Sequence, residues 1–261
     1  MAAAVFIKIF PFVLITLGLL PSAIWLLFYL RQDLHPEPKK MILKVFLWGM
    51  LVAPLAVLAQ YVTLAALDVN HIAAAAGIGL IALAGIEELL KYLVVRTEIE
   101  EEPDFNEPTD AMVYMIAAAL GFATIENISI AFSIAPEGVS PGQGINTANL
   151  LEASRVLGVR FLGATLLHAF SSAVVGYFLA VHFFKKRGLW TIWMGLGIAT
   201  TLHALFNYLI LQSVTLNGLV FLVSSVCMVG VIVGLFKHVR SMASRSTNLA
   251  NMRTASQDTP L

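Results

Sequence analysis

The sequence predicts an all-α fold, a polytopic bundle of about seven transmembrane helices with a polar site between four of them. Three observations support this prediction. Of 261 residues, 59% are hydrophobic and 12% are charged, which is about half the charged fraction of a soluble globular domain. The hydrophobic residues form long runs near the roughly 20 residues that a helix needs to cross a bilayer. The sequence lacks the alternating ten-residue pattern of an outer-membrane barrel.

The composition also excludes several classes of protein. Sixteen Lys and Arg residues balance sixteen Asp and Glu residues, so no net positive field attracts a nucleic acid and we expect no such partner. Cys227 is the single cysteine and lies in an apolar run. A single cysteine cannot form an internal disulfide framework or a cysteine-based metal site, so both are excluded. We expect an integral membrane protein whose main surroundings are the lipid bilayer.

Polar interruptions divide the chain into seven apolar stretches. These predicted spans are 5–30, 41–67, 71–96, 110–134, 154–184, 189–212 and 217–237. We interpret residues 1–237 as one multi-span membrane domain and residues 238–261 as a polar cytoplasmic tail. The first stretch contains Pro21, a residue type that can break a helix. It is too long, and too poor in small residues at its end, to be a cleavable signal peptide.

Basic residues indicate which side of the membrane each connection faces. Twelve Lys and Arg residues flank the spans on the side of the first, third and fifth connections and the tail. Three lie on the opposite side, namely Lys8, Arg155 and Arg160. Cytoplasmic loops carry an excess of Lys and Arg, so this bias predicts an external N-terminus and a cytoplasmic C-terminus.

Ionisable and amide side chains occur inside four of the predicted spans. Such residues are costly in a bilayer unless they are paired or hydrated, and they often mark a functional site. They are Glu87, Glu88 and Lys91 in the third span, Glu126 and Asn127 in the fourth, His168 in the fifth, and His203 and Asn207 in the sixth. Small residues nearby allow close helix packing. We therefore expect the four helices to converge on one polar centre.

Two carboxylates and two imidazoles in a cavity of low dielectric constant suit the activation of water. A glutamate beside a histidine can deprotonate water for attack on a peptide carbonyl, while an Asn and a second His donate to the oxyanion. The same residues could hold a divalent metal such as zinc, although the HExxH pattern is absent from the sequence. The chemistry alone leaves a hydrolase, a metal carrier and a proton-coupled transporter open.

The chain carries four motifs in order: EELLK at 87–91, FATIEN at 122–127, His168 followed by Gly176, and HALFN at 203–207. This ordered set resembles the PrsW family of intramembrane proteases, which is grouped with CAAX prenyl endopeptidases and bacteriocin-processing proteases. The segment RQDLHPEP at 31–38 is similar to the Asp and Pro-Glu-Pro segment that follows the first span of that family. The likeness extends over about residues 25–210, and the specific signal is the ordered set of motifs.

The resemblance implies an intramembrane endopeptidase that cleaves a membrane-anchored protein, of the anti-sigma-factor kind, in the cytoplasmic membrane of a prokaryote. Glu87, with Glu88 beside it, is the expected general base, and His168 is the expected activating imidazole. Glu126 stands where the CAAX enzymes have a histidine. His203 and Asn207 are expected to bind the oxyanion. Lys91, Asn127 and Asp110 are expected to support the site.

Three further interpretations follow from the residues. Asp110, in the sequence Pro108-Thr109-Asp110, is typical of a helix N-cap. A glutamate mechanism needs no cofactor, whereas a metal-dependent protease would use Glu87, Glu126, His168 and His203 as ligands. A transporter or a non-catalytic scaffold built on the same polar core is the remaining alternative.

Overall fold

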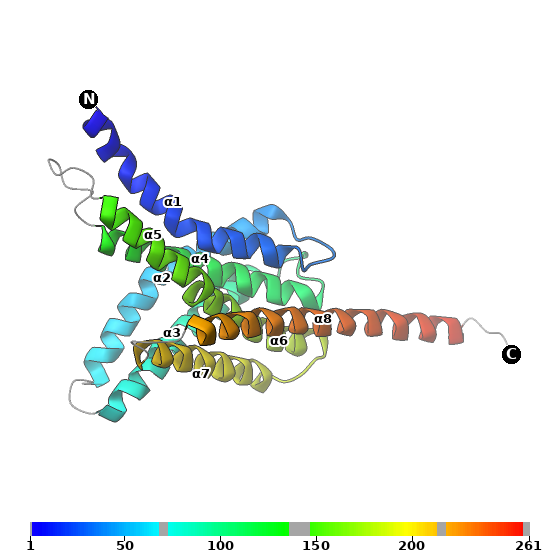
Figure 1. The fold of residues 1–261 in the computed structure, drawn as a ribbon. Coiled ribbons are helices and arrows are strands. Elements are labelled where there is room, and N and C mark those ends of the chain that lie inside the picture. The colour runs from blue at the N-terminus through cyan, green and yellow to red at the C-terminus, as the bar shows by residue number, and fades with distance from the viewer. Residues whose placement is uncertain (1, 68–72, 136–146, 213–217, 258–261) are drawn as a thin grey trace.

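A computed structural model describes residues 2–67, 73–135, 147–212 and 218–257 of the chain. These residues form eight α-helices and no strand (Figure 1). The helices are α1 (Ala2–Leu30), α2 (Lys39–Leu67), α3 (Ala73–Glu98), α4 (Pro108–Ile134), α5 (Thr147–Leu162), α6 (Ala164–Phe184), α7 (Trp190–Gln212) and α8 (Gly218–Gln257). The predicted all-α class is confirmed, and every predicted span contains a helix.

Five helical segments are long and apolar enough to cross a membrane. They are Ile9–Leu30, Lys39–Ala66, Pro108–Ile134, Ala148–Phe184 and Gly218–Met242. Two other predicted spans correspond to α3 and α7, which carry much of the polar site. Large apolar side chains such as Leu55, Leu58 and Val226 are exposed on the outside of the bundle, as expected for surfaces that face lipid. The chain is therefore an integral membrane protein of the helical kind.

α4 is the central helix of the bundle. All its residues from Pro108 to Thr124 are buried, and it packs against α1, α2 and α6. Glycines allow α2 and α4 to approach closely. A Cβ atom added to Gly121 would lie 2.0 Å from the carbonyl oxygen of Phe46. Because α4 also carries Asn127 and Glu126, its seat against α2 helps to position the polar site.

The predicted span 154–184 contains two helices rather than one. α5 and α6 meet at Gly163, whose φ and ψ are −105° and −98°. A Cβ atom there would lie 3.0 Å from the ring of Phe221 in α8. Ser225 of α8 donates a hydrogen bond of 2.8 Å to the carbonyl oxygen of Leu162, which satisfies an acceptor at the end of α5. The expectation of one uninterrupted helix is therefore corrected to a kinked pair.

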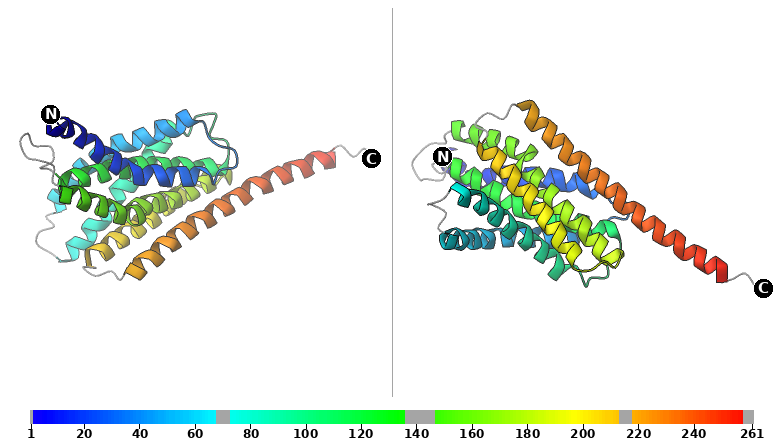
Figure 2. Two further views of the ribbon diagram at one scale, coloured as in Figure 1. Left: turned by 45° about the horizontal axis from the view of Figure 1, so that its top comes forward. Right: turned by 90° about the horizontal axis from the view of Figure 1, so that it is seen from below.

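The two terminal helices are both long. α1 continues through Pro11 and Pro21, so neither proline ends it. α8 continues past residue 237, where the domain boundary was predicted, and its C-terminal half extends beyond the other helices (Figures 1 and 2). The division into a domain at 1–237 and a tail at 238–261 remains a prediction.

Candidate active site

The ionisable residues selected from the sequence lie together between α3, α4, α6 and α7. We call this group the inner cluster. Its members are Glu87, Glu88 and Lys91 of α3, Glu126 of α4, His168 of α6 and His203 of α7. All of them except Glu126 are buried. The predicted convergence of four helices on one polar centre is confirmed.

Glu88 is the carboxylate with the most partners in the inner cluster. Its Oε1 accepts hydrogen bonds from Lys91 Nζ at 2.8 Å and Ser171 Oγ at 2.9 Å, and its Oε2 accepts one from Ser172 Oγ at 3.1 Å. His203 Nδ1 lies 2.8 Å from the same Oε1. These partners offset the cost of burying the charge. Glu88 is therefore placed to hold Lys91 and His203 in position.

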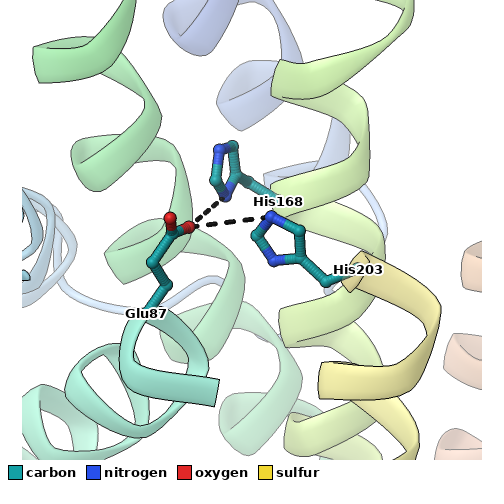
Figure 3. Close-up of side chains that lie close together, drawn as sticks. All are labelled: Glu87, His168 and His203. Atoms are coloured by element: carbon teal, nitrogen blue, oxygen red, sulfur yellow. Dashed lines mark ion pairs between the residues drawn. The ribbon is translucent and has the colours of Figure 1, made fainter. Parts of the chain in front are cut away.

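Glu87 has one oxygen that lacks a partner. Its Oε1 accepts a hydrogen bond of 2.8 Å from Gln60 Nε2 of α2. Its Oε2 is buried and has no hydrogen-bond partner among the described residues. This Oε2 lies 3.8 Å from His168 Nδ1 and 3.7 Å from His203 Nε2 (Figure 3). A buried oxygen without a hydrogen bond lowers the stability of the fold by about 1–3 kcal/mol or more. A ligand bound to Glu87 Oε2 would offset this cost.

Each histidine contacts another carboxylate through the ring nitrogen that faces away from Glu87. His168 Nε2 lies 2.8 Å from Glu126 Oε2, and His203 Nδ1 lies 2.8 Å from Glu88 Oε1. A carboxylate partner holds the proton on the nitrogen that it contacts. The other nitrogen of each ring then carries a lone pair on the side of Glu87, and in His168 this nitrogen also lies 2.8 Å from Lys91 Nζ. The two rings meet edge to face with centroids 5.0 Å apart.

Lys91 places a positive charge at the centre of the cluster. Its Nζ lies 2.8 Å from Glu88 Oε1, 2.8 Å from His168 Nδ1 and 3.7 Å from Glu87 Oε2. It also lies 4.6 Å from the centroid of the Phe122 ring, a distance at which a cation is attracted to the aromatic face. A ligand between Glu87 and His168 would therefore compete with the contact from Lys91 to His168.

Glu87, His168 and His203 fit the donor set of a divalent metal. One ligand atom from each lies within 4.8 Å of the others. Tetrahedral zinc with bonds of about 2.0–2.1 Å separates its ligand atoms by roughly 3.4 Å, and two of the separations here are 3.7 and 3.8 Å. Two imidazoles and one carboxylate leave a fourth position for water. Glu126 contacts the far nitrogen of His168, so it fits an outer partner rather than the ligand that was expected.

Several residues that the sequence analysis did not select as part of the site contact the cluster. Besides Gln60, Ser171 and Ser172, the most informative is Arg160 of α5. Its Nη2 lies 3.0 Å from Glu126 Oε2, and its Nε donates a hydrogen bond of 2.7 Å to Asn127 Oδ1. From the charge distribution along the sequence, Arg160 was expected among the external basic residues. Its place inside the predicted span 154–184 was a signal that could have identified it.

Two of the expected site residues lie apart from this network. Asn207 is half-buried on α7, one turn beyond His203, and makes no hydrogen bond to the inner cluster in the described part of the chain. Asp110 lies at the start of α4, about 24 Å along the helix from Glu126. Asp110 Oδ2 accepts a hydrogen bond of 2.6 Å from the backbone N–H of Glu107. Glu107 is the N-cap and Asp110 the third residue of a reciprocal capping box, which corrects the predicted N-cap because the helix begins at Pro108.

A groove of about 470 Å³ adjoins the inner cluster. Its lining is mainly apolar, with side chains from α2 and α4 that include Pro54, Val57 and Ile125. Gln60 and Glu126 also line it. Glu126 belongs to both the groove and the inner cluster, and Gln60 of the groove donates a hydrogen bond to Glu87 of the cluster. A segment of polypeptide in the groove would lie against Gln60 and Glu126, which contact Glu87 and His168 of the inner cluster.

A helical membrane protein with buried glutamates and histidines beside such a groove fits the class of membrane-embedded peptidases, and comparison with known proteins supports this class. The chain belongs to the PrsW family. The family model, described as PrsW family intramembrane metalloprotease, matches residues 37–235. The resemblance inferred from the motifs is thus confirmed for the PrsW family, and the protein is a membrane peptidase.

Curated relatives agree with this assignment. Protease PrsW of Geobacillus kaustophilus (strain HTA426) is 31% identical over 202 residues, which cover 77% of this chain and 80% of that protein. Protease PrsW of Bacillus subtilis (strain 168) is 26% identical over 204 residues, which cover 76% of this chain and 83% of that protein. No solved structure matches the chain significantly.

Proposed function

We propose that this protein is an intramembrane endopeptidase that hydrolyses a membrane-anchored protein at a metal site formed by Glu87, His168 and His203. The observation that carries the proposal is the buried Glu87 Oε2, which lacks a hydrogen-bond partner among the described residues and faces both histidines. The description of the matching family as a metalloprotease family supports the same chemistry. A divalent metal bound there would act as a Lewis acid and lower the pKa of water.

The protein's own residues prepare this site. Glu88 and Glu126 orient His203 and His168, and such outer carboxylates commonly strengthen a metal ligand. The side chain of Glu126 is 29% exposed and lines the groove, so it links the groove to His168, whose far nitrogen it contacts. Lys91, close to Glu87 and His168, can donate toward negative charge that develops on a substrate carbonyl.

The groove supports a substrate that approaches from the membrane. Its apolar walls suit a spanning segment, and Gln60 and Glu126 offer polar contacts to exposed backbone groups.

An anti-sigma-factor-like protein is the substrate that the resemblance implies. The corresponding location is the cytoplasmic membrane of a prokaryote, with the N-terminus outside and the C-terminus in the cytoplasm. Membership of the wider superfamily with CAAX prenyl endopeptidases and an oxyanion role for Asn207 belong to the same proposal.

One observation favours a second candidate, a glutamate mechanism without metal. Lys91 Nζ lies 2.8 Å from His168 Nδ1, the nitrogen whose lone pair a metal would need. In this mechanism Glu87 is the general base, and Lys91 balances its charge. The same groove and the same class of substrate apply.

Metal content and proteolysis together distinguish the two mechanisms. Purified wild-type protein in lipid nanodiscs is analysed for bound zinc and for cleavage of single-span membrane proteins, with and without a strong chelator. Glu87→Gln and His203→Ala are compared with Glu152→Gln, which alters an exposed carboxylate of α5. We expect zinc in the wild type and in Glu152→Gln, none in the two site variants, and cleavage that the chelator abolishes and zinc restores. Cleavage that survives the chelator and is lost in Glu87→Gln would instead establish the glutamate mechanism.

A further inference from the structure

A second group of carboxylates lies at the other end of α4. Asp33 and Glu37 belong to the connection between α1 and α2, and Asp110 belongs to the first turn of α4. One carboxylate oxygen from each lies within 4.8 Å of the others. We call these three residues the loop cluster. About 24 Å of α4 separates Asp110 from Glu126, so the loop cluster is distinct from the inner cluster.

Two oxygens of the loop cluster are buried without a partner. Asp33 is 7% exposed and Asp110 is 1% exposed. Asp33 Oδ1 accepts a hydrogen bond of 3.1 Å from the backbone N–H of His35, and Asp110 Oδ2 caps α4. The remaining oxygens, Asp33 Oδ2 and Asp110 Oδ1, have no hydrogen-bond partner in the part of the chain that the structure describes. The carboxyl groups of Glu37 and Asp110 also lie within hydrogen-bond reach of one another, a contact that a cation bound between them would replace.

The surrounding side chains do not neutralise these carboxylates by direct contact. No ion pair to Asp33, Glu37 or Asp110 occurs among the described residues. Arg240 donates to Gln32, and His35 pairs with Glu107. Glu37 accepts a hydrogen bond from the neutral hydroxyl of Tyr114. Burial raises the pKa of Asp33 and of Glu37, as expected where desolvation outweighs the positive charge nearby.

We propose that the loop cluster binds a hard divalent cation, Mg²⁺ or Ca²⁺, through Asp33, Glu37 and Asp110. Three carboxylates with no His or Cys form an all-oxygen donor set, which suits these ions rather than zinc. Water would complete the coordination shell because neither ion is satisfied by three ligands. The bound ion would join the connection between α1 and α2 to the first turn of the central helix.

Binding of Mn²⁺ tests the proposal, because free Mn²⁺ is visible by electron paramagnetic resonance and can occupy Mg²⁺ sites. The full chain is measured in nanodiscs with the inner cluster disabled by Glu87→Gln and His203→Ala, and the wild-type chain provides a second background. We expect a Mn²⁺ site in both backgrounds that excess Mg²⁺ or Ca²⁺ displaces. Asp33→Asn and Asp110→Asn should each weaken it by about tenfold or more, since ligand charge sets affinity.

The substitutions are chosen to preserve the fold. In Asp33→Asn, the asparagine keeps an oxygen that can accept the hydrogen bond from the His35 N–H. In Asp110→Asn, it keeps an oxygen that can cap α4. Asp104→Asn is the matched control. It removes a nearby negative charge on a half-buried side chain that is not part of the loop cluster. We expect a loss of affinity of less than about threefold, because a charge that does not contact the ion is partly screened by solvent.

Thermal unfolding gives an independent readout. Mg²⁺ should raise the unfolding midpoint of the wild type and of Asp104→Asn, but not that of Asp33→Asn. The proposal is overturned if the protein with a disabled inner cluster binds no Mn²⁺, which would indicate that the carboxyl groups share protons instead. Equal affinities in Asp33→Asn, Asp110→Asn and Asp104→Asn would overturn it as well.

Discussion

The inner cluster and the loop cluster both bury carboxylates, yet they satisfy them in different ways. Glu88 has four donors from its own chain, and Glu126 contacts both His168 and Arg160. Glu87 of the inner cluster keeps one oxygen without a hydrogen-bond partner, but Lys91 lies 3.7 Å from it. In the loop cluster, Asp33 and Asp110 each keep such an oxygen and have no ion pair among the described residues. Depth in the membrane explains the difference. Ions and water are scarce in the hydrocarbon region, so the chain must supply the compensating charge there, whereas a connection at the end of the bundle can take an ion from solution.

Removing a partner from the inner cluster has the largest expected effect. In Glu88→Gln, the fully buried Lys91 loses its nearest carboxylate. Breaking one side of a buried ion pair costs about 3–5 kcal/mol. We expect a large loss of stability in thermal unfolding and no detectable proteolysis.

Two further variants test the cause of this loss. Lys91→Met combined with Glu88→Gln removes both charges and should recover much of the stability but not the activity. Glu152→Gln alters an exposed carboxylate and should behave as the wild type. Wild-type stability in Glu88→Gln would show that the inner cluster does not depend on its internal charges.

A smaller effect is expected when α4 is moved away from α2. α4 carries Asp110 of the loop cluster and Glu126 of the inner cluster. In Gly121→Ala, the new Cβ atom would meet the carbonyl oxygen of Phe46 at 2.0 Å, and α2 and α4 must separate. Overpacking of this kind costs about 1–3 kcal/mol. Circular dichroism on heating and a cleavage assay should both show the loss. Gly77→Ala on α3 is the control, since its Cβ atom meets nothing within 4 Å; an equal loss in both variants would contradict the steric explanation.

The sequence located the inner cluster better than it predicted the pairing within it. Glu87, His168 and His203 stand out because ionisable residues are rare in apolar spans. Pairing depends on helix rotation and side-chain rotamers, which spacing along the chain does not determine. Glu126 was expected as a ligand only in the metal-dependent alternative, and its Oε2 contacts the far nitrogen of His168.

Other features could not be recognised for different reasons. Asp33 and Glu37 lie in a polar connection, where carboxylates are common, so only the tertiary structure reveals that they are buried near Asp110. The helix positions were predicted well because long apolar runs dominate the sequence. The break at Gly163 was missed because the apolar pattern continues across it, and the contact with Phe221 that accompanies it is distant in the chain.

A moderate effect on activity is expected from Arg160, which acts on the inner cluster through Glu126. In Arg160→Met, Glu126 loses a cation 3.0 Å away but keeps His168. Loss of a direct partner of a metal ligand typically lowers activity by about 10–100-fold. Because Arg160 acts one contact further out, we expect a fall in kcat/KM of about tenfold, at the low end of this range. Arg160→Lys should recover part of the activity. Arg155→Met, which alters a side chain that is 75% exposed, should retain wild-type kcat/KM; an equal fall in both would point to a general effect on α5.

The smallest expected effect is a gain in stability, whereas Glu88→Gln is expected to lose stability. With divalent cations removed by a chelator, the wild-type loop cluster holds buried negative charge without a direct cationic partner among the described residues. Asp33→Asn removes one of these charges and keeps the acceptor for the His35 N–H, so we expect the variant to be more stable by about 1 kcal/mol or less. With Mg²⁺ present, the wild type should gain stability that the variant cannot, and the order of the two unfolding midpoints should reverse. If Asp33→Asn is less stable under both conditions, the loop cluster is neutralised from within the chain, as the inner cluster is.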